Sequence, residues 1–153
     1  MTKMEEAPTW RDVLDRCGLQ VLDEGASNGP PVLSAIYAVN GIEVKPIATV
    51  PLSSPGATID LDAKWHFHAA RISLYSESGE FLILPPVPKG HEIGWVRVRD
   101  TVGKSLPSRI AETTGKKEFI TVSIDGRRLC ATSKEDDDYW VVVHEFPRQE
   151  TEG

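Results

Sequence analysis

Residues 118–146 read EFITVSIDGRRLCATSKEDDDYWVVVHEF and predict three short antiparallel strands in succession. Three runs are expected to be strands, and β-branched and aromatic residues dominate the first and the last of them, as is typical of strands. The runs are 118–124, 127–133 and 139–146. Asp125-Gly126 separates the first two as a two-residue hairpin turn, and the loop KEDDD separates the last two. This stretch therefore predicts a β-meander.

The two faces of this meander are expected to differ. One face carries the core side chains Ile120, Val122, Ile124, Leu129, Ala131, Val141 and Val143. The opposite face is mixed and carries the candidate partner-binding residues Phe119, Arg128, Trp140, Val142 and His144. Because aromatic side chains dominate the energetics of protein interfaces, the mixed face is the expected contact surface.

Turn signals separate further apolar runs toward the N-terminus. Asn40-Gly41 lies between two such runs and predicts a second hairpin over residues 32–50, because a type I′ turn needs positive φ at both turn positions. Pro46 cannot donate a ladder hydrogen bond, which indicates an edge or a bulge. Residues 59–69 alternate between apolar odd positions and polar even positions, so they predict a long strand.

Two short helices are expected beside these strands. Residues 9–17 predict a helix with Thr9 as its N-cap and Gly18 as its terminator. Its apolar stripe consists of Trp10, Val13, Leu14 and Cys17. Residues 105–114 predict a second helix that is ended by Gly115.

The chain has 153 residues, of which 40% are hydrophobic and 26% charged, as expected of one domain with its own core. About eight short strands predict a mainly β, α+β fold, either an antiparallel β-sandwich or a partly open barrel, over residues 1–147. Residues 148–153 are expected to be a polar tail. No apolar run reaches the length of a membrane span, and no secretory signal precedes Cys17. We therefore expect a cytoplasmic protein with reduced Cys17 and Cys130, although a single bridge between them stays open.

Two histidines suggest a metal site. On a strand, His66 and His68 would point to one side, where they could bind a divalent metal such as zinc with a third ligand from a neighbouring strand. The candidate third ligands are Asp60, Asp62, His91 and His144. A metal-dependent β-barrel enzyme is thus one alternative function. The other interpretation is a polar, solvent-facing stripe that needs no cofactor.

A basic segment lies inside an acidic chain. The net charge is −6, whereas residues 97–128 carry eight basic and four acidic side chains. Because Trp95 lies just before this segment and Phe119 lies within it, the segment could hold a nucleic-acid backbone and stack bases, which is a second alternative function. Its candidate residues are Arg97, Arg99, Lys104, Arg109, Lys116, Lys117 and Arg127. Solvated surface and contact with an acidic protein are the other interpretations.

Two further patterns resemble chemical sites. In the predicted register Cys130 and His144 lie diagonally on one face, which could activate a thiolate. Residues 103–105 (Gly-Lys-Ser) resemble the end of a phosphate-binding loop, but Val98 stands where that loop needs its first glycine.

No catalytic motif is complete, so the leading hypothesis is a non-enzymatic protein-binding module that uses the outer face of the C-terminal meander and nearby charge patches. Small proteins of this kind often act as inhibitors, immunity factors or adaptors, including those carried by phages. The expected partner is another protein, with a homodimer also open. Neither a membrane nor a cofactor is expected.

Overall fold

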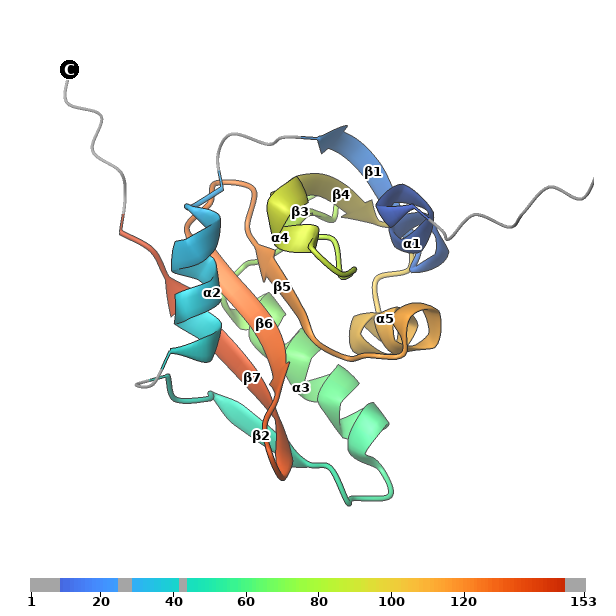
Figure 1. The fold of residues 1–153 in the computed structure, drawn as a ribbon, viewed down its shortest axis with the longest axis vertical. Coiled ribbons are helices and arrows are strands. Elements are labelled where there is room, and N and C mark those ends of the chain that lie inside the picture. Colours follow the sequence, from blue (N-terminus) through green and yellow to red (C-terminus); the bar gives the residue numbers. More distant parts are fainter. Residues whose placement is uncertain (1–8, 25–28, 42–43, 148–153) are drawn as a thin grey trace, which may run out of the picture.

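The computed structural model describes residues 9–24, 29–41 and 44–147, which form one antiparallel sheet covered by helices (Figure 1). The sheet has seven strands in the order β1-β4-β3-β5-β6-β7-β2. The strands are β1 (Leu19–Glu24), β2 (Ala48–Pro51), β3 (Glu80–Ile83), β4 (Val96–Asp100), β5 (Phe119–Val122), β6 (Arg128–Lys134) and β7 (Asp138–Glu145). The helices are α1 (Trp10–Arg16), α2 (Val32–Asn40), α3 (Ala57–Arg71), α4 (Gly90–Ile93) and α5 (Leu106–Thr114). The mainly β, α+β class is confirmed, and the sheet is open, with β1 and β2 at its edges.

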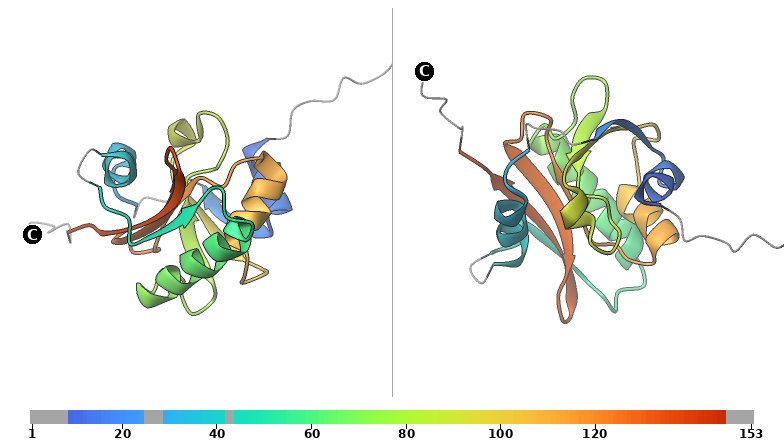
Figure 2. Two further views of the ribbon diagram at one scale, coloured as in Figure 1. Left: turned by 90° about the horizontal axis from the view of Figure 1, so that it is seen from below. Right: turned by 45° about the horizontal axis from the view of Figure 1, so that its top comes forward.

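Helices lie on both faces of this sheet (Figure 2, left). On one face, α3 packs together with α1 and α5, and the core there is built around the fully buried Trp65 and Phe81. On the other face, α2 packs on the central strands through Ala35 and Val39. None of the helices in the described ranges is long and apolar enough to cross a membrane.

Both helices predicted from capping signals are present. The Thr9 side chain accepts the backbone N–H of Asp12, and the Asp12 carboxylate accepts the N–H of Thr9, which completes a capping box at the start of α1. Gly18 follows α1 with a φ of +80°, and Gly115 ends α5 with a φ of +81°. These are the left-handed positions at which glycine carries no steric cost.

Two predicted strands are wrong, because both segments are helical. Residues 32–40 form α2, and residues 59–69 belong to α3. Asn40 is the last residue of α2, and Gly41 has a φ of −68°, so the pair is not a type I′ turn. The hairpin predicted over residues 32–50 is therefore replaced by a helix, a connection and the short edge strand β2.

The C-terminal meander is confirmed, but its last strand is displaced by one residue from the predicted register. Cys130 pairs with Val143 instead of Val142, and Leu129 pairs with His144. A one-residue shift moves every side chain of a strand to the other face of the sheet. The side chains of β7 predicted for the two faces are consequently exchanged relative to β5 and β6.

Candidate functional site

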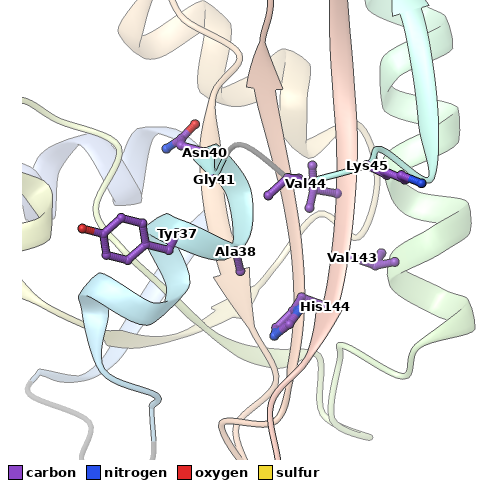
Figure 3. A pocket seen from close by; sticks show the side chains of 9 residues that line it. Tyr37, Ala38, Asn40, Gly41, Val44, Lys45, Val143 and His144 are labelled. Carbon is purple, nitrogen blue, oxygen red and sulfur yellow. The ribbon is translucent and has the colours of Figure 1, made fainter.

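A groove lies between α2 and the C-terminal half of β7 (Figure 3). Its volume is about 820 Å³. The lining residues are Tyr37, Ala38, Asn40, Gly41, Val44, Lys45, Val142, Val143 and His144. We refer to it as the α2–β7 groove. In Figure 3, Ala38 and His144 approach the groove from opposite sides, and Tyr37 projects from α2 at its rim.

The outward face of α2 is apolar and exposed beside this groove. Leu33 is 66% exposed and Tyr37 is 70% exposed, one helical turn apart. The sheet-facing side of the same helix buries Ala35 and Val39. Because α2 carries apolar side chains on both sides, the side with Leu33 and Tyr37 stays exposed in the described part of the chain.

The C-terminal half of β7 has a strand neighbour on one side only. β6 pairs with β7 as far as Glu145, whereas β2 pairs with it only from Asp138 to Val141. We call the remaining segment, Val142–Glu145, the free edge of β7. Within the described residues, no strand lies along its outer side.

Pro46 explains why the pairing of β2 stops at this point. Val141 pairs with Ala48, yet its carbonyl also accepts the N–H of Ile47 at 2.8 Å. Two residues of the edge chain thus oppose one residue of β7, which is the arrangement of a β-bulge. The next residue is Pro46, which has no N–H with which to continue the ladder. Pro46 itself lies outside β2, two residues before this edge strand begins.

The free edge of β7 presents backbone hydrogen-bonding groups outward. The N–H of Phe146 donates to the carbonyl of Arg127 at 2.7 Å, so the even-numbered residues of β7 point their backbone groups toward β6. In an antiparallel ladder these groups alternate, and Val143 and Glu145 therefore point theirs away from β6. The observed bond to the carbonyl of Val141 from the β2 side agrees with this alternation.

A second groove lies on the other face of the same edge. It is lined by Arg71, Ile72, Ser73, Arg128, Val143, His144 and Glu145, and its volume is about 530 Å³. We call it the α3-side groove, since its wall is the end of α3 and the residues that follow. The free edge of β7 is thus flanked by a depression on each face of the sheet.

The charges around this edge are unevenly compensated. Glu145 forms an ion pair with Arg127 at 3.2 Å, and Arg128 forms one with Asp125 at 3.1 Å. Lys45 in the α2–β7 groove and Arg71 in the α3-side groove form no ion pair with any described residue. The guanidinium of Arg71 instead lies 5.8 Å from the ring centroid of Phe67. The edge therefore carries two uncompensated positive charges in an acidic chain.

The five predicted partner-binding residues do not form one surface. Phe119 is 4% exposed and packs against Trp65 beneath α3, with 5.2 Å between the ring centroids. Trp140 and His144 lie on the opposite, α2-facing side of the sheet, while the side chain of Arg128 lies on the α3 side. The predicted grouping is wrong because the predicted register of β7 differs by one residue from the observed one. Val142 and His144 line the α2–β7 groove, and whether they bind a partner stays a prediction.

The strand geometry predicted for a metal site is also wrong. His66 and His68 lie on α3, where residues two positions apart point to roughly opposite sides. The Nε2 atom of His66 accepts the backbone N–H of Leu106 at 3.0 Å, which is a helix-capping contact. Over the described ranges, no group of three or more His, Cys, Asp or Glu side chains is placed to hold a metal ion.

Four of the seven basic residues predicted for nucleic-acid binding are held by carboxylates. The carboxylate of Glu80 bonds to both Arg97, at 2.5 Å, and Arg99, at 3.3 Å. Arg109, with a side chain 14% exposed, bonds to Asp100 at 2.9 Å. Arg127 bonds to Glu145, as described above. The ammonium of Lys117 lies 5.1 Å from the ring centroid of Tyr139, and Lys104 and Lys116 are exposed.

The segment that resembles the end of a phosphate-binding loop makes structural contacts within the chain. Burial would raise the pKa of Asp100, but hydrogen bonds from Arg109 and from the N–H groups of Gly103 and Val102 hold it below its usual value. A carboxylate of the chain thus already occupies the loop amides that a phosphate would need.

The predicted thiolate pair is not formed. Cys130 is fully buried beneath α3, with its Sγ 4.0 Å from the carbonyl of Trp65, and burial raises the pKa of its thiol. His144 is exposed and lies on the other face of the sheet. Cys17 is also buried, and both thiols are free, so there is no bridge between them.

Tyr37, Lys45 and Arg71 define the two grooves together with the end of β7, and none of them is among the site residues predicted from the sequence. Leu33 and Tyr37 at i and i+4 were a possible signal of an apolar helix face, but they were assigned to a strand. No protein-family model, curated protein or solved structure matches this chain.

Proposed function

We propose that the protein is a non-enzymatic protein-binding module that binds a segment of another protein at the α2–β7 groove. The observation that carries this proposal is the groove itself, with Tyr37 on one wall and an unpaired strand end on the other, and with the exposed Leu33 beside it on α2. Exposed apolar patches beside polar backbone groups are typical of protein interaction sites.

Three titratable groups of the α3 face support binding over catalysis, because Asp62, His66 and Asp100 each have a structural contact. Asp62 and His66 bond to backbone groups of α5, and Asp100 bonds to Arg109. Arg109 also donates to the carbonyl of Cys17 at 2.6 Å, which ties α5 to the end of α1. These groups hold the helices of the α3 face together and lie away from the α2–β7 groove.

A random heptapeptide array, probed with the fluorescently labelled full chain, tests this proposal. Wild-type protein is expected to bind a subset of the peptides, and Tyr37→Ser should weaken that binding at least tenfold. Tyr37 is 70% exposed, so its replacement should change the free energy of unfolding by only about 0.5 kcal/mol. Thermal melting of each variant verifies that the fold is intact.

Two matched controls are available on other surfaces. Ile59→Ser removes an apolar side chain that is 74% exposed on α3, on the opposite face of the sheet, and should leave peptide binding unchanged. His144→Ser should weaken binding, whereas His91→Ser, at an exposed position on α4, should not. The proposal is overturned if no peptide binds, or if the groove variants and their controls behave alike.

A further inference from the structure

We infer that the free edge of β7 binds an extended, acidic segment of the partner protein as an additional β-strand. This inference rests on the proposed function and specifies the conformation and charge of the segment that is bound. An extended peptide that joins a sheet edge gains affinity from main-chain hydrogen bonds and specificity from alternate side chains.

The backbone of β7 has outward-facing hydrogen-bonding groups that an added strand could pair with. Val143 and Glu145 direct their N–H and carbonyl groups outward, and β2 does not reach them, because Pro46 interrupts its ladder. An incoming strand would occupy the place into which β2 would otherwise have continued. Edge groups of this kind are a template for pairing unless the fold covers them.

The α2–β7 groove and the α3-side groove lie on the two faces of the free edge of β7. Successive side chains of a strand point to opposite faces of a sheet. A strand added at the free edge of β7 would therefore direct alternate side chains toward the α2–β7 groove and toward the α3-side groove. Both depressions are present, with volumes of about 820 Å³ and 530 Å³, and His144 contributes to each.

The positive charges beside the free edge of β7 indicate which class of peptide segment would bind there. Lys45 lies in one groove and Arg71 in the other, and neither has a carboxylate partner among the residues that the structure describes. Glu145, the acidic residue of this edge, is already paired with Arg127. Asp or Glu side chains on alternate positions of the bound strand would compensate these two charges.

The same charges disfavour a second copy of this chain as the occupant. In a symmetric pairing of two β7 edges, each residue of the patch meets the patch of the other subunit. Arg71 and Lys45 would then approach their own copies, and like charges across an interface repel one another. An acidic segment has no such conflict.

Backbone amide exchange tests the inference with peptides selected by the heptapeptide array. In the free chain, the amides of Val143 and Glu145 should exchange faster than those of Val142 and His144, which donate toward β6. Saturation with a selected peptide should slow exchange at Val143 and Glu145 at least tenfold. The selected peptides should be rich in Asp and Glu and should lack proline at alternate positions.

A charge-reversal variant provides an independent test. The double substitution K45E/R71E should weaken binding of the acidic peptides about tenfold and shift the selection toward basic peptides. K134E makes the same change at an exposed position near the β6–β7 turn and should alter neither property.

Several results would overturn the inference while leaving the proposed function intact. The first is a set of selected peptides that is not enriched in Asp and Glu. The second is protection from amide exchange that is confined to α2 when a selected peptide binds. The third is a dimer of the chain, formed through β7 and independent of salt, that sedimentation detects. In each of these cases Tyr37→Ser would still weaken peptide binding. If the array yields no peptide at all, the proposed function fails together with the inference.

Discussion

His66 and Leu106 connect two helices, because the Nε2 atom of His66 accepts the backbone N–H of Leu106 at 3.0 Å. One turn earlier on α3, the carboxylate of Asp62 accepts the backbone N–H of Ser108 at 2.9 Å and also its hydroxyl. Ser105, the N-cap of α5, makes no capping bond with its own side chain. The first turn of α5 is therefore capped by another helix, and α3 and α5 depend on each other.

Acidification below pH 6.5 should lower the free energy of unfolding. Burial lowers the pKa of His66 below its ordinary value of 6.5. His66 therefore binds a proton less readily in the folded state than in the unfolded chain. The stabilisation is complete above pH 6.5 and is lost as the pH falls through the lower pKa of the folded state. Urea unfolding at a series of pH values from 7.5 downward measures this slope.

Two substitutions at His66 separate the titration from the hydrogen bond. His66→Gln keeps an acceptor but cannot titrate, so the dependence on pH should flatten. His66→Ala also removes the acceptor and should cost about 1 kcal/mol of unfolding free energy even at pH 7.5. A wild-type slope in both variants would show that His66 is not the group responsible.

Asp62→Ala should lower the free energy of unfolding by about 1–2 kcal/mol, as expected for loss of a helix cap. The reason is that the backbone N–H and the hydroxyl of Ser108 both lose their acceptor. Asp136→Ala, at the exposed β6–β7 turn, is the matched control and should change stability by less than about 0.5 kcal/mol. Chemical denaturation compares the two, and equal effects would contradict a capping role.

The sequence of α3 shows why a helix was mistaken for a strand. Its buried residues lie four positions apart at Ala57, Leu61, Trp65 and Ala69. A spacing of four satisfies the period of two of a strand as well as the period of 3.6 of a helix. Ile59 and Phe67, which lie between these buried residues, distinguish a helix from a strand. A strand would bury both of them on the same face as Leu61 and Trp65. They are 74% and 57% exposed.

The meander was predictable from its turn residues and strand formers, but its faces were not. The KEDDD loop fixes how β6 and β7 are offset, and one residue of displacement exchanges the faces of Trp140 and Val141. Val142 and His144 could still be named as site candidates. Lys45 and Arg71 could not, because their place depends on how β2 ends and where α3 stops.

Neither cysteine should react with a thiol reagent in the folded protein. Cys17 and Cys130 are both buried, and burial raises the pKa of each thiol, so little thiolate forms and the reagent has no access. Titration with a disulfide reagent at pH 8 should give fewer than about 0.1 thiols per chain until denaturant is added, and then both thiols. Rapid labelling of Cys130 in the native state would contradict its position beneath α3.

Replacement of Phe119 and of Trp140 should give opposite results, although both were predicted to lie on one contact face. Phe119 is buried against Trp65, so Phe119→Ala leaves a cavity and should cost about 3–5 kcal/mol of unfolding free energy. Trp140 is only partly buried and belongs to neither core cluster, so Trp140→Ala should cost about 1 kcal/mol and shift Tm by a few degrees. Thermal and urea unfolding measure both variants. A larger loss at Trp140 than at Phe119 would contradict the observed register, which buries Phe119 beneath α3 and places Trp140 on the opposite face of the sheet.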